Sequence, residues 1–246
     1  MTALLRAEAL KLRTTRTLYG YLLVLVVLSG IGAAAQANAA HLVELEDPSF
    51  QRDLLSRAVA APLIALLLGI VSVTVEWRHG TITRTLLVSP RRWRVLAAKE
   101  VNAFALGVVL ALLGLGVTIA VAAPILSRDG TPLQVDRALA GRIGEIVLAS
   151  ALWGALGAGV GALLQHQAGV LVGAIIWVVI VESLAAALLH WAGLQGVADV
   201  LPRHALDALA GHEEGLSPGA GGAVGFLYVG LFAILAFLRL RRQDIT

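Results

Sequence analysis

The sequence predicts an all-α polytopic membrane protein with six transmembrane helices, and three observations carry that prediction. Of the 246 residues, 58% are hydrophobic and 14% are charged, whereas a soluble domain has about 45–50% apolar and about 25% charged residues. The mean hydropathy is +0.84. Six apolar runs have the length, about 17–25 residues, that a helix needs to cross roughly 30 Å of hydrocarbon. Helices are the expected spanning elements because they satisfy their own backbone hydrogen bonds in lipid.

The six runs follow one another along the chain and are separated by charged or turn-forming residues. We expect them to form a single transmembrane domain over residues 1–246, with helices at 18–40, 58–75, 101–126, 145–164, 168–191 and 221–238. The chain has no cysteine, which excludes disulfide scaffolds and thiolate sites. Its net charge of +3 does not favour a nucleic-acid partner.

The positive charges indicate one orientation in the membrane. Most of the 19 Lys and Arg residues lie in three segments, at 1–17, 76–100 and 239–246, and short basic loops stay on the cytoplasmic side. Acidic residues concentrate instead in the first loop and the last loop of the other side. We therefore expect both termini in the cytoplasm and a multi-pass protein of the plasma membrane in a bacterial cell.

Residues 1–17 combine apolar and basic side chains at helical spacing. Leu4, Leu5 and Leu12 fall on one side, which predicts an interfacial amphipathic helix on the inner leaflet. A basic tail that only sets the topology is the simpler alternative. A cleaved secretory signal is another, because a basic segment, an apolar run and the small residues of 33–40 follow in the order that such a signal has.

The segment 76–100 is much longer than a connection between two membrane helices requires, and long loops commonly carry function. We expect a short helix at Thr81–Val88, ended by Ser89 and Pro90, and a second basic amphipathic turn at Arg91–Lys99. Apolar residues among cationic ones on a cytoplasmic face indicate a docking surface for another protein. Contact of the basic residues with anionic membrane lipids is the alternative.

Four motifs occur in order on this six-span frame. They are Leu5-x-Ala7-Glu8-x-x-Lys11-Leu12-Arg13; Glu76-x-Arg78-x-Gly80-Thr81 followed by Leu86-Leu87-x-Ser89-Pro90-Arg91 and Ala97-Ala98-Lys99; Leu201-Pro202 with Ala205 and Ala208-Leu209; and Arg241-Arg242-x-Asp244-Ile245-Thr246. Together they resemble the permeases of ABC-2 type transporters, the transmembrane subunits of ABC exporters. The similarity covers nearly the whole chain.

This resemblance implies the ABC-2 type exporter fold and a half-transporter that dimerises, as a homodimer or a heterodimer. It also implies a separate ABC ATPase subunit, in two copies, as the motor. The chain has no Gly-x-x-x-x-Gly-Lys-[Ser/Thr] phosphate loop, so we expect ATP and Mg²⁺ on the partner and neither a cofactor nor a catalytic residue in this chain. In the family the loop between the second and third spans couples the two subunits. The corresponding residues here are Glu76, Arg78, Gly80, Thr81, Ile82, Leu86 and Leu87.

Glu182 lies well inside the fifth expected span. A charged carboxylate near the bilayer centre costs about 2.5–3.5 kcal/mol, so Glu182 should face protein or water. It either lines the translocation path or packs between helices, with Gln36 and Asn38 at a similar depth as candidate partners. The resemblance places the second and fifth spans beside the substrate, and the corresponding path residues are Val71, Val75, Trp177 and Glu182. Their apolar surroundings favour an amphiphilic or hydrophobic substrate, such as a drug, a lipid or a peptide.

The last external loop, 192–220, contains an amphipathic stretch at 201–211 that would either dip into the membrane as a re-entrant element or serve as a simple connection. Other functions remain open at this level. An intramembrane hydrolase would use Glu213 and Glu214 with nearby histidines, namely His190, His204 and His212. A scaffold or immunity protein would keep the permease frame without transport. A secondary transporter usually has several intramembrane charges or broken helices.

Overall fold

The computed structural model of the chain describes residues 2–14, 16–39, 47–83, 85, 91–128, 130–212 and 215–242, and in these residues the regular structure is entirely helical. The helices are α1 (Thr2–Thr14), α2 (Arg16–Ala39), α4 (Pro48–Ala58), α5 (Ala61–Arg78), α7 (Arg92–Arg128), α8 (Arg137–Leu164), α9 (Gln167–Ile176), the π-helical turn η1 (Trp177–Val181), α10 (Glu182–Trp191), α11 (Gln195–Ala198), α12 (Pro202–Leu209) and α13 (Pro218–Arg242). The all-α prediction is confirmed.

Six helical segments of the described chain are long and apolar enough to cross a membrane. They are Arg16–Ala39, Pro48–Arg78, Arg92–Arg128, Arg137–Leu164, Gln167–Trp191 and Pro218–Arg242. Each coincides with one of the six predicted runs. The chain therefore has the architecture of a multi-pass membrane protein.

The boundaries of two helices differ from the prediction. The basic turn expected at Arg91–Lys99 is the first part of the 37-residue helix α7, so the connection after α5 is shorter than 76–100. Helix α8 begins at Arg137 rather than near 145, and the Asp136 carboxylate caps it by accepting from the backbone N–H of Leu139 at 2.7 Å. In both cases charged residues extend the helix beyond its apolar run.

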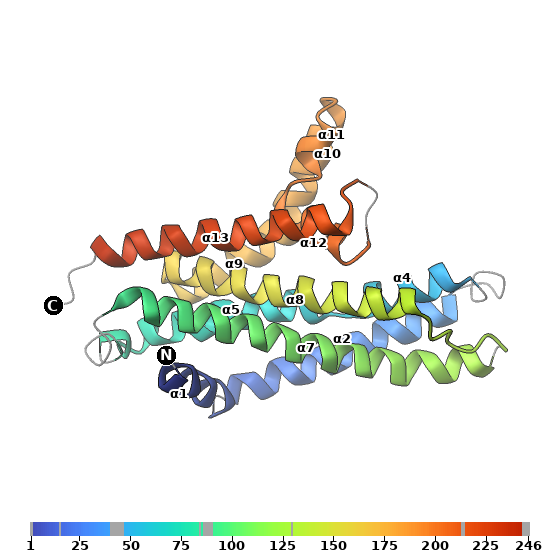
Figure 1. Ribbon diagram of the computed structural model, residues 1–246, viewed down its shortest axis with the longest axis horizontal. Helices are drawn as coiled ribbons and strands as arrows, with labels where there is room; N and C mark the ends of the chain where they lie inside the picture. The colour runs from blue at the N-terminus through green and yellow to red at the C-terminus, as the bar shows by residue number, and fades with distance from the viewer. Residues whose placement is uncertain are drawn as a thin grey trace.

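The long helices form one bundle with two distinct ends (Figure 1). At the end that we call the near end lie α1, the last turn of α5, the first turn of α7 and the last turn of α13. At the opposite, far end lie α4, the last turn of α7 and the first turn of α8. Helices α10 and α11 stand away from the other helices, so the fifth segment leaves the bundle as it proceeds.

Helices α5 and α8 form the centre of the bundle and pack backbone to backbone. A Cβ atom added at Gly69 of α5 would lie 2.2 Å from the carbonyl oxygen of Gly154, and one added at Gly157 of α8 would lie 2.2 Å from that of Leu66. Neither position accepts a side chain without a shift of the helices. This contact fixes the two helices that wall the cavity described below.

Candidate functional site

Glu182 is 0% exposed, although it lies in a helix that leaves the bundle. Its carboxylate oxygen Oε1 accepts from the backbone N–H of Arg203 and, at 3.3 Å, from that of His204. Its other oxygen, Oε2, accepts from the indole Nε1–H of Trp177 at 3.1 Å. The carboxylate thus serves as the N-terminal cap of α12, a helix whose own N-cap residue, Leu201, supplies no side-chain acceptor.

The partners of Glu182 are therefore on α12 and on its own helix. The amide nitrogen of Asn38, expected to approach Glu182, instead donates to the carbonyl oxygen of Ala34 at 2.7 Å. The hydrogen-bond donors to Glu182 among the described residues are Trp177, Arg203 and His204, and Gln36 is not one of them. That expectation was wrong because a helix N-terminus with unsatisfied N–H groups comes within reach of the carboxylate.

The π-helical turn explains how Trp177 and Val178 join this network. The backbone N–H of Glu182 bonds to the carbonyl of Trp177, five residues earlier, so the carbonyl of Val178 lacks that α-helical donor. The Arg203 guanidinium supplies a replacement, because its Nη1 donates to Val178 O at 3.3 Å and to Ser183 Oγ at 2.9 Å. Single π-helical turns of this kind occur frequently at functional sites.

Arg203 also pairs with Asp207 one turn along α12, with 3.2 Å between Arg203 Nε and Asp207 Oδ2. Burial raises the pKa of the Asp207 carboxyl above its ordinary value, although the charges of His212, Arg203 and His204 oppose that shift. The Nδ1 of His204 lies 3.6 Å from Glu182 Oε1. Helix α12 therefore brings three neighbouring titratable side chains, those of Arg203, His204 and Asp207, to the inside of the molecule.

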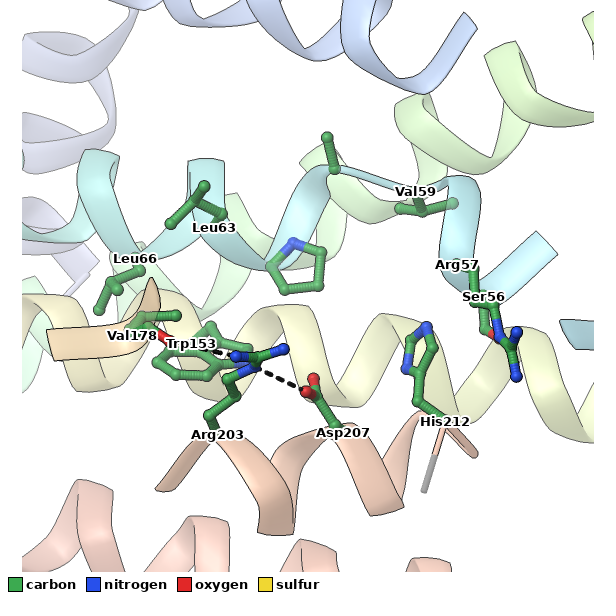
Figure 2. A pocket seen from close by; sticks show the side chains of 12 residues that line it. Ser56, Arg57, Val59, Leu63, Leu66, Trp153, Val178, Arg203, Asp207 and His212 are labelled. Carbon is green, nitrogen blue, oxygen red and sulfur yellow. Dashed lines mark hydrogen bonds and ion pairs between the residues drawn. The ribbon is translucent and has the colours of Figure 1, made fainter. Parts of the chain in front are cut away.

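A cavity of about 420 Å³ lies beside this network, and we call it the polar chamber. Figure 2 shows Arg203 and Asp207 on one wall, with Trp153 of α8 beside them and His212 on the side where Ser56 and Arg57 lie at the end of α4. Its lining residues are Ser56, Arg57, Val59, Ala60, Pro62, Leu63, Leu66, Trp153, Val178, Arg203, Asp207 and His212.

A second cavity of about 460 Å³, the apolar chamber, lies between α5, α8, α9, η1, α12 and α13. Its lining residues are Leu66, Trp153, Leu156, Val160, Leu164, Gly169, Val170, Gly173, Ala174, Trp177, Val178, Leu201, Pro202, Tyr228 and Phe232. The chambers share Leu66, Trp153 and Val178. Because Leu164 ends α8 at the near end and Arg57 lies on α4, the two chambers follow one another along the length of the bundle.

The predicted path residues divide into two groups. Trp177 lines the apolar chamber, and Glu182 supports its wall by capping α12. Val71 is 5% exposed and lines neither chamber, nor does Val75. Both valines lie on α5 beyond Leu66, where Val71 is buried and Val75 is partly buried.

Several wall residues of the chambers were not singled out from the sequence. Arg57, Trp153 and Phe232 lie on α4, α8 and α13, at positions outside the four motifs. Arg203 and Asp207 had a usable signal, since an Arg and an Asp four residues apart fall on one face of the amphipathic stretch at 201–211.

At the near end, four charged side chains form a closed cluster that joins α1, α5 and α7. Lys11 Nζ lies 2.7 Å from both Glu8 Oε1 and Glu76 Oε1, and Lys99 Nζ lies 2.9 Å from both Glu8 Oε2 and Glu76 Oε1. The side chains of Glu8, Glu76 and Lys99 are 8%, 5% and 2% exposed, whereas that of Lys11 is 47% exposed. We call these residues the near-end cluster.

The charges of the near-end cluster balance, which is the condition for burying them. Burial lowers the pKa of the Lys11 ammonium, but its hydrogen bonds to Glu76 and Glu8 outweigh burial and leave the pKa above its ordinary value. Asn102 of α7 adds a further link to α1 by donating to the carbonyl of Leu5 at 3.4 Å. Helix α1 is thereby held against α5 and α7, and its position on the inner leaflet stays a prediction.

The predicted coupling residues occupy different environments. Glu76 is buried in the near-end cluster, whereas Arg78, Gly80 and Thr81 are exposed. Ile82 packs against Val95 and Leu240. Leu86 and Leu87 lie outside the described residues, as does half of the helix expected at Thr81–Val88; of its described residues, Ile82, Thr83 and Thr85 are helical. Among the described members of the set, the exposed ones are therefore Arg78, Gly80 and Thr81.

The exposed turn after α5 has two features that bear on its role. Gly80 has a φ of 63°, in the left-handed region, and a Cβ atom there would meet nothing within 4 Å. The guanidinium Nη1 of Arg78 lies 3.5 Å from Gln167 Oε1 at the start of α9. This turn thus touches the beginning of the fifth segment as well as the end of α5.

The hydrolase alternative rests on His190, His204, His212, Glu213 and Glu214, and of these the structure describes only the histidines. His190 lies on α10, where its Nδ1 is 2.8 Å from Ala186 O, one turn back on its own helix, and Glu213 and Glu214 lie outside the described residues. Among the residues that the structure describes, no group of three or more His, Cys, Asp or Glu side chains could hold a metal ion.

No protein-family model matches the chain. A comparison with curated proteins finds no significant match either.

Proposed function

We propose that this chain is the permease subunit of an ABC transporter and exports an amphiphilic or hydrophobic substrate by alternating access. The observation that carries the proposal is the pair of chambers that follow one another along a six-helix membrane bundle, with Leu66, Trp153 and Val178 between them. A transport path needs a binding space within the membrane and a constriction that closes one side at a time. Ligand sites of this size are typical for small molecules.

The motor in this proposal is a separate ATPase subunit. The four sequence motifs that resemble ABC-2 type permeases support it, and so does the exposed turn at Arg78, Gly80 and Thr81. ATP and Mg²⁺ would bind to that partner, and this chain would contribute no catalytic group. In the membrane, the near end would be cytoplasmic, because it carries the basic segments of the chain.

The geometry suggests how movement at the near end reaches the chambers. Helix α5 runs from the exposed turn to Leu66, which is one of the residues between the two chambers. The near-end cluster binds α5 to α1 and α7, so these three helices would shift together. Arg78 would carry the same movement to Gln167 at the start of the fifth segment.

A second permease chain would complete the transporter. Helix α10 stands away from the bundle and exposes large apolar side chains, with Leu184 59%, Leu188 58% and Trp191 89% exposed. In a half-transporter such a surface would face lipid or the other permease chain, which is either identical or related. The scaffold alternative would give the same surface without transport, and only the experiment below separates them.

The test begins with gentle detergent extraction of a tagged copy from its native cell, mass spectrometry of the proteins that co-purify, and an ATPase assay. We expect a stoichiometric ABC ATPase. Charge reversal by Arg78→Glu should uncouple ATP hydrolysis from transport, whereas the matched Arg128→Glu at the far end should not. Recovery of the chain without an ATPase under several mild conditions would contradict the proposal and favour a scaffold or a secondary transporter.

Gly80 provides a sharper variant of the same test. Gly80→Val places a β-branched residue at a φ of 63°, which is strongly unfavourable, whereas Gly80→Asn is tolerated there. We expect the valine variant to insert and fold but to lose substrate-stimulated ATPase activity, and the asparagine variant to retain it. Equal activity of the two variants would show that the shape of this turn does not matter for coupling.

A further inference from the structure

The polar chamber has an excess of positive charge. Two guanidinium groups, of Arg57 and Arg203, face one carboxylate, that of Asp207. Arg203 already neutralises Asp207 at 3.2 Å. Arg57 pairs only loosely with Asp53, at 4.0 Å, and its side chain is 59% exposed. The guanidinium of Arg57 is therefore the charge that remains available to a ligand, and it favours an anion.

A second group on the same chamber also lacks a protein partner. The Nδ1 atom of His212 is buried and has no hydrogen-bond partner among the described residues. Figure 2 shows the imidazole of His212 on the side of the chamber where Arg57 lies. A buried ring nitrogen without a partner is costly unless something else satisfies it. A ligand head group near Arg57 and His212 would supply that contact.

The apolar chamber offers no such groups. Its walls are aliphatic and aromatic, and the one hydroxyl among them, that of Tyr228, already donates to Val200 O at 3.0 Å. The two chambers adjoin at Trp153, and each is as large as a typical small-molecule site. A single molecule that fills both must be charged at one end and apolar at the other.

We infer that the two chambers bind one amphiphile, with an anionic carboxylate or phosphate head against Arg57 and His212 and an alkyl or acyl tail in the apolar chamber. This inference names the substrate class of the proposed function and rests on it for the direction of movement. Binding itself is independent of transport and is measured without a motor. A cationic amphiphile is disfavoured because Asp207 is already paired with Arg203.

Bromine quenching of tryptophan fluorescence reports on the tail, because Trp153 and Trp177 line the apolar chamber. The full-length protein in a neutral detergent is titrated with ω-bromododecanoate, ω-bromododecanol and ω-bromododecyltrimethylammonium. We expect saturable quenching at about tenfold lower concentration for the carboxylate than for the other two. Dodecyl phosphate should compete with it, and inorganic phosphate should not. Half-saturation at the same concentration for all three probes would overturn the inference. Competition by inorganic phosphate would also overturn it, because the polar chamber would then bind a free anion rather than the head group of an amphiphile.

Two matched pairs of variants locate the head and the tail. Arg57→Gln should weaken binding of ω-bromododecanoate by about tenfold, while Arg52→Gln on the same helix, outside the chamber, should leave it unchanged. Gly173→Leu should fill the apolar chamber, and Gly116→Leu on α7 should not; a Cβ at either position meets nothing within 4 Å. Equal effects within either pair would contradict the assignment.

The outcomes separate this inference from the proposed function. Loss of selective binding in a preparation that still co-purifies with its ATPase would overturn the anionic substrate and leave the permease proposal intact. Selective binding in a chain that never associates with an ATPase would support the anionic amphiphile and overturn the permease proposal.

Discussion

Two buried glutamates, Glu76 and Glu182, are stabilised in opposite ways. Glu76 is 4% exposed and its charge is balanced by two ammonium groups, those of Lys11 and Lys99. Glu182 is 0% exposed and receives mainly neutral donors, the backbone N–H groups at the start of α12 and the indole of Trp177. The first arrangement is balanced in charge, because two ammonium groups face two carboxylates, although both ammonium groups contact Glu76 Oε1 and its buried Oε2 has no hydrogen-bond partner among the described residues.

The difference indicates that the near-end cluster is rigid, whereas the network around Glu182 can respond to a ligand. The near-end cluster joins three helices by charges that cannot separate without leaving a buried ion unpaired. The Glu182 network joins two elements by hydrogen bonds, and its outer members, Arg203 and Asp207, line the polar chamber. A ligand can therefore alter the second network directly, whereas only a movement of whole helices alters the first.

The largest expected effect is on the near-end cluster. Lys99→Met would leave the carboxylates of Glu8 and Glu76 with only the half-exposed Lys11 between them. We expect a loss of about 3–5 kcal/mol in the free energy of unfolding, measured by chemical unfolding in mixed micelles. Lys11→Met should cost about 1 kcal/mol or less, because water reaches that ammonium. Equal losses in the two variants would mean that the cluster is not closed.

The next effect concerns the cap on α12. Glu182→Leu would leave the N–H groups of Arg203, His204 and Trp177 without their acceptor, and we expect a loss of about 2–3 kcal/mol. Glu182→Gln keeps one acceptor oxygen and should lose about 1 kcal/mol. Unfolding in mixed micelles measures both. If glutamine cost as much as leucine, the charge of Glu182 would matter more than its hydrogen bonds, and the contrast with Glu76 would disappear.

A smaller effect concerns the close packing of α12 against α13. A Cβ atom at Gly221 would lie 2.3 Å from Ala205 O, whereas one at Gly219 meets nothing within 4 Å. Gly221→Ala should therefore destabilise the protein by about 1–3 kcal/mol through overpacking, and Gly219→Ala should not. Hydrogen exchange should show loosening at α12 and unchanged protection at α1. Loosening at both ends would indicate that the two networks are coupled through the bundle.

The smallest effect is a dependence on pH. Burial raises the pKa of Asp207 in the folded protein, and the charges of His212, Arg203 and His204 oppose this. The folded state thus holds the proton more tightly than the unfolded chain, so Asp207 makes the stability fall as pH rises from its ordinary pKa of about 3.9 toward the raised value. Asp207→Asn should flatten this fall, as thermal unfolding measured at increasing pH from about pH 4 would show. An unchanged slope would assign the pH dependence to another group.

Run length predicted all six membrane helices because a bilayer requires about 20 apolar residues in one helix. The run length did not predict where α7 begins. Arg92, Arg94 and Lys99 looked like surface residues, but Lys99 is 2% exposed because Glu8 and Glu76 approach it. Those carboxylates are distant from Lys99 in the sequence, and no local sequence pattern predicts that Lys99 pairs with them.

Glu182 also shows that a sequence can identify a buried charged residue without identifying its partner. Its position within an apolar run predicted that it would face protein, since an isolated charge in lipid is costly. Its acceptor role at α12 could not be predicted, because the partner helix follows some twenty residues later and its approach depends on the packing against α13. The residue was identifiable from the sequence, whereas its partner depended on the fold.

The measurement that tests alternating access most directly uses the absence of cysteine from the chain. Ala60→Cys places a thiol on the polar chamber, and His79→Cys places one on the exposed turn at the near end. In proteoliposomes containing the purified complex, each is labelled with a membrane-impermeant maleimide, with and without ATP and vanadate. We expect the two thiols to be reached from opposite sides, and the rate at Ala60→Cys to change severalfold with nucleotide. A labelling rate at Ala60→Cys that ATP and vanadate do not alter, from either side of the membrane, would contradict transport by this chain.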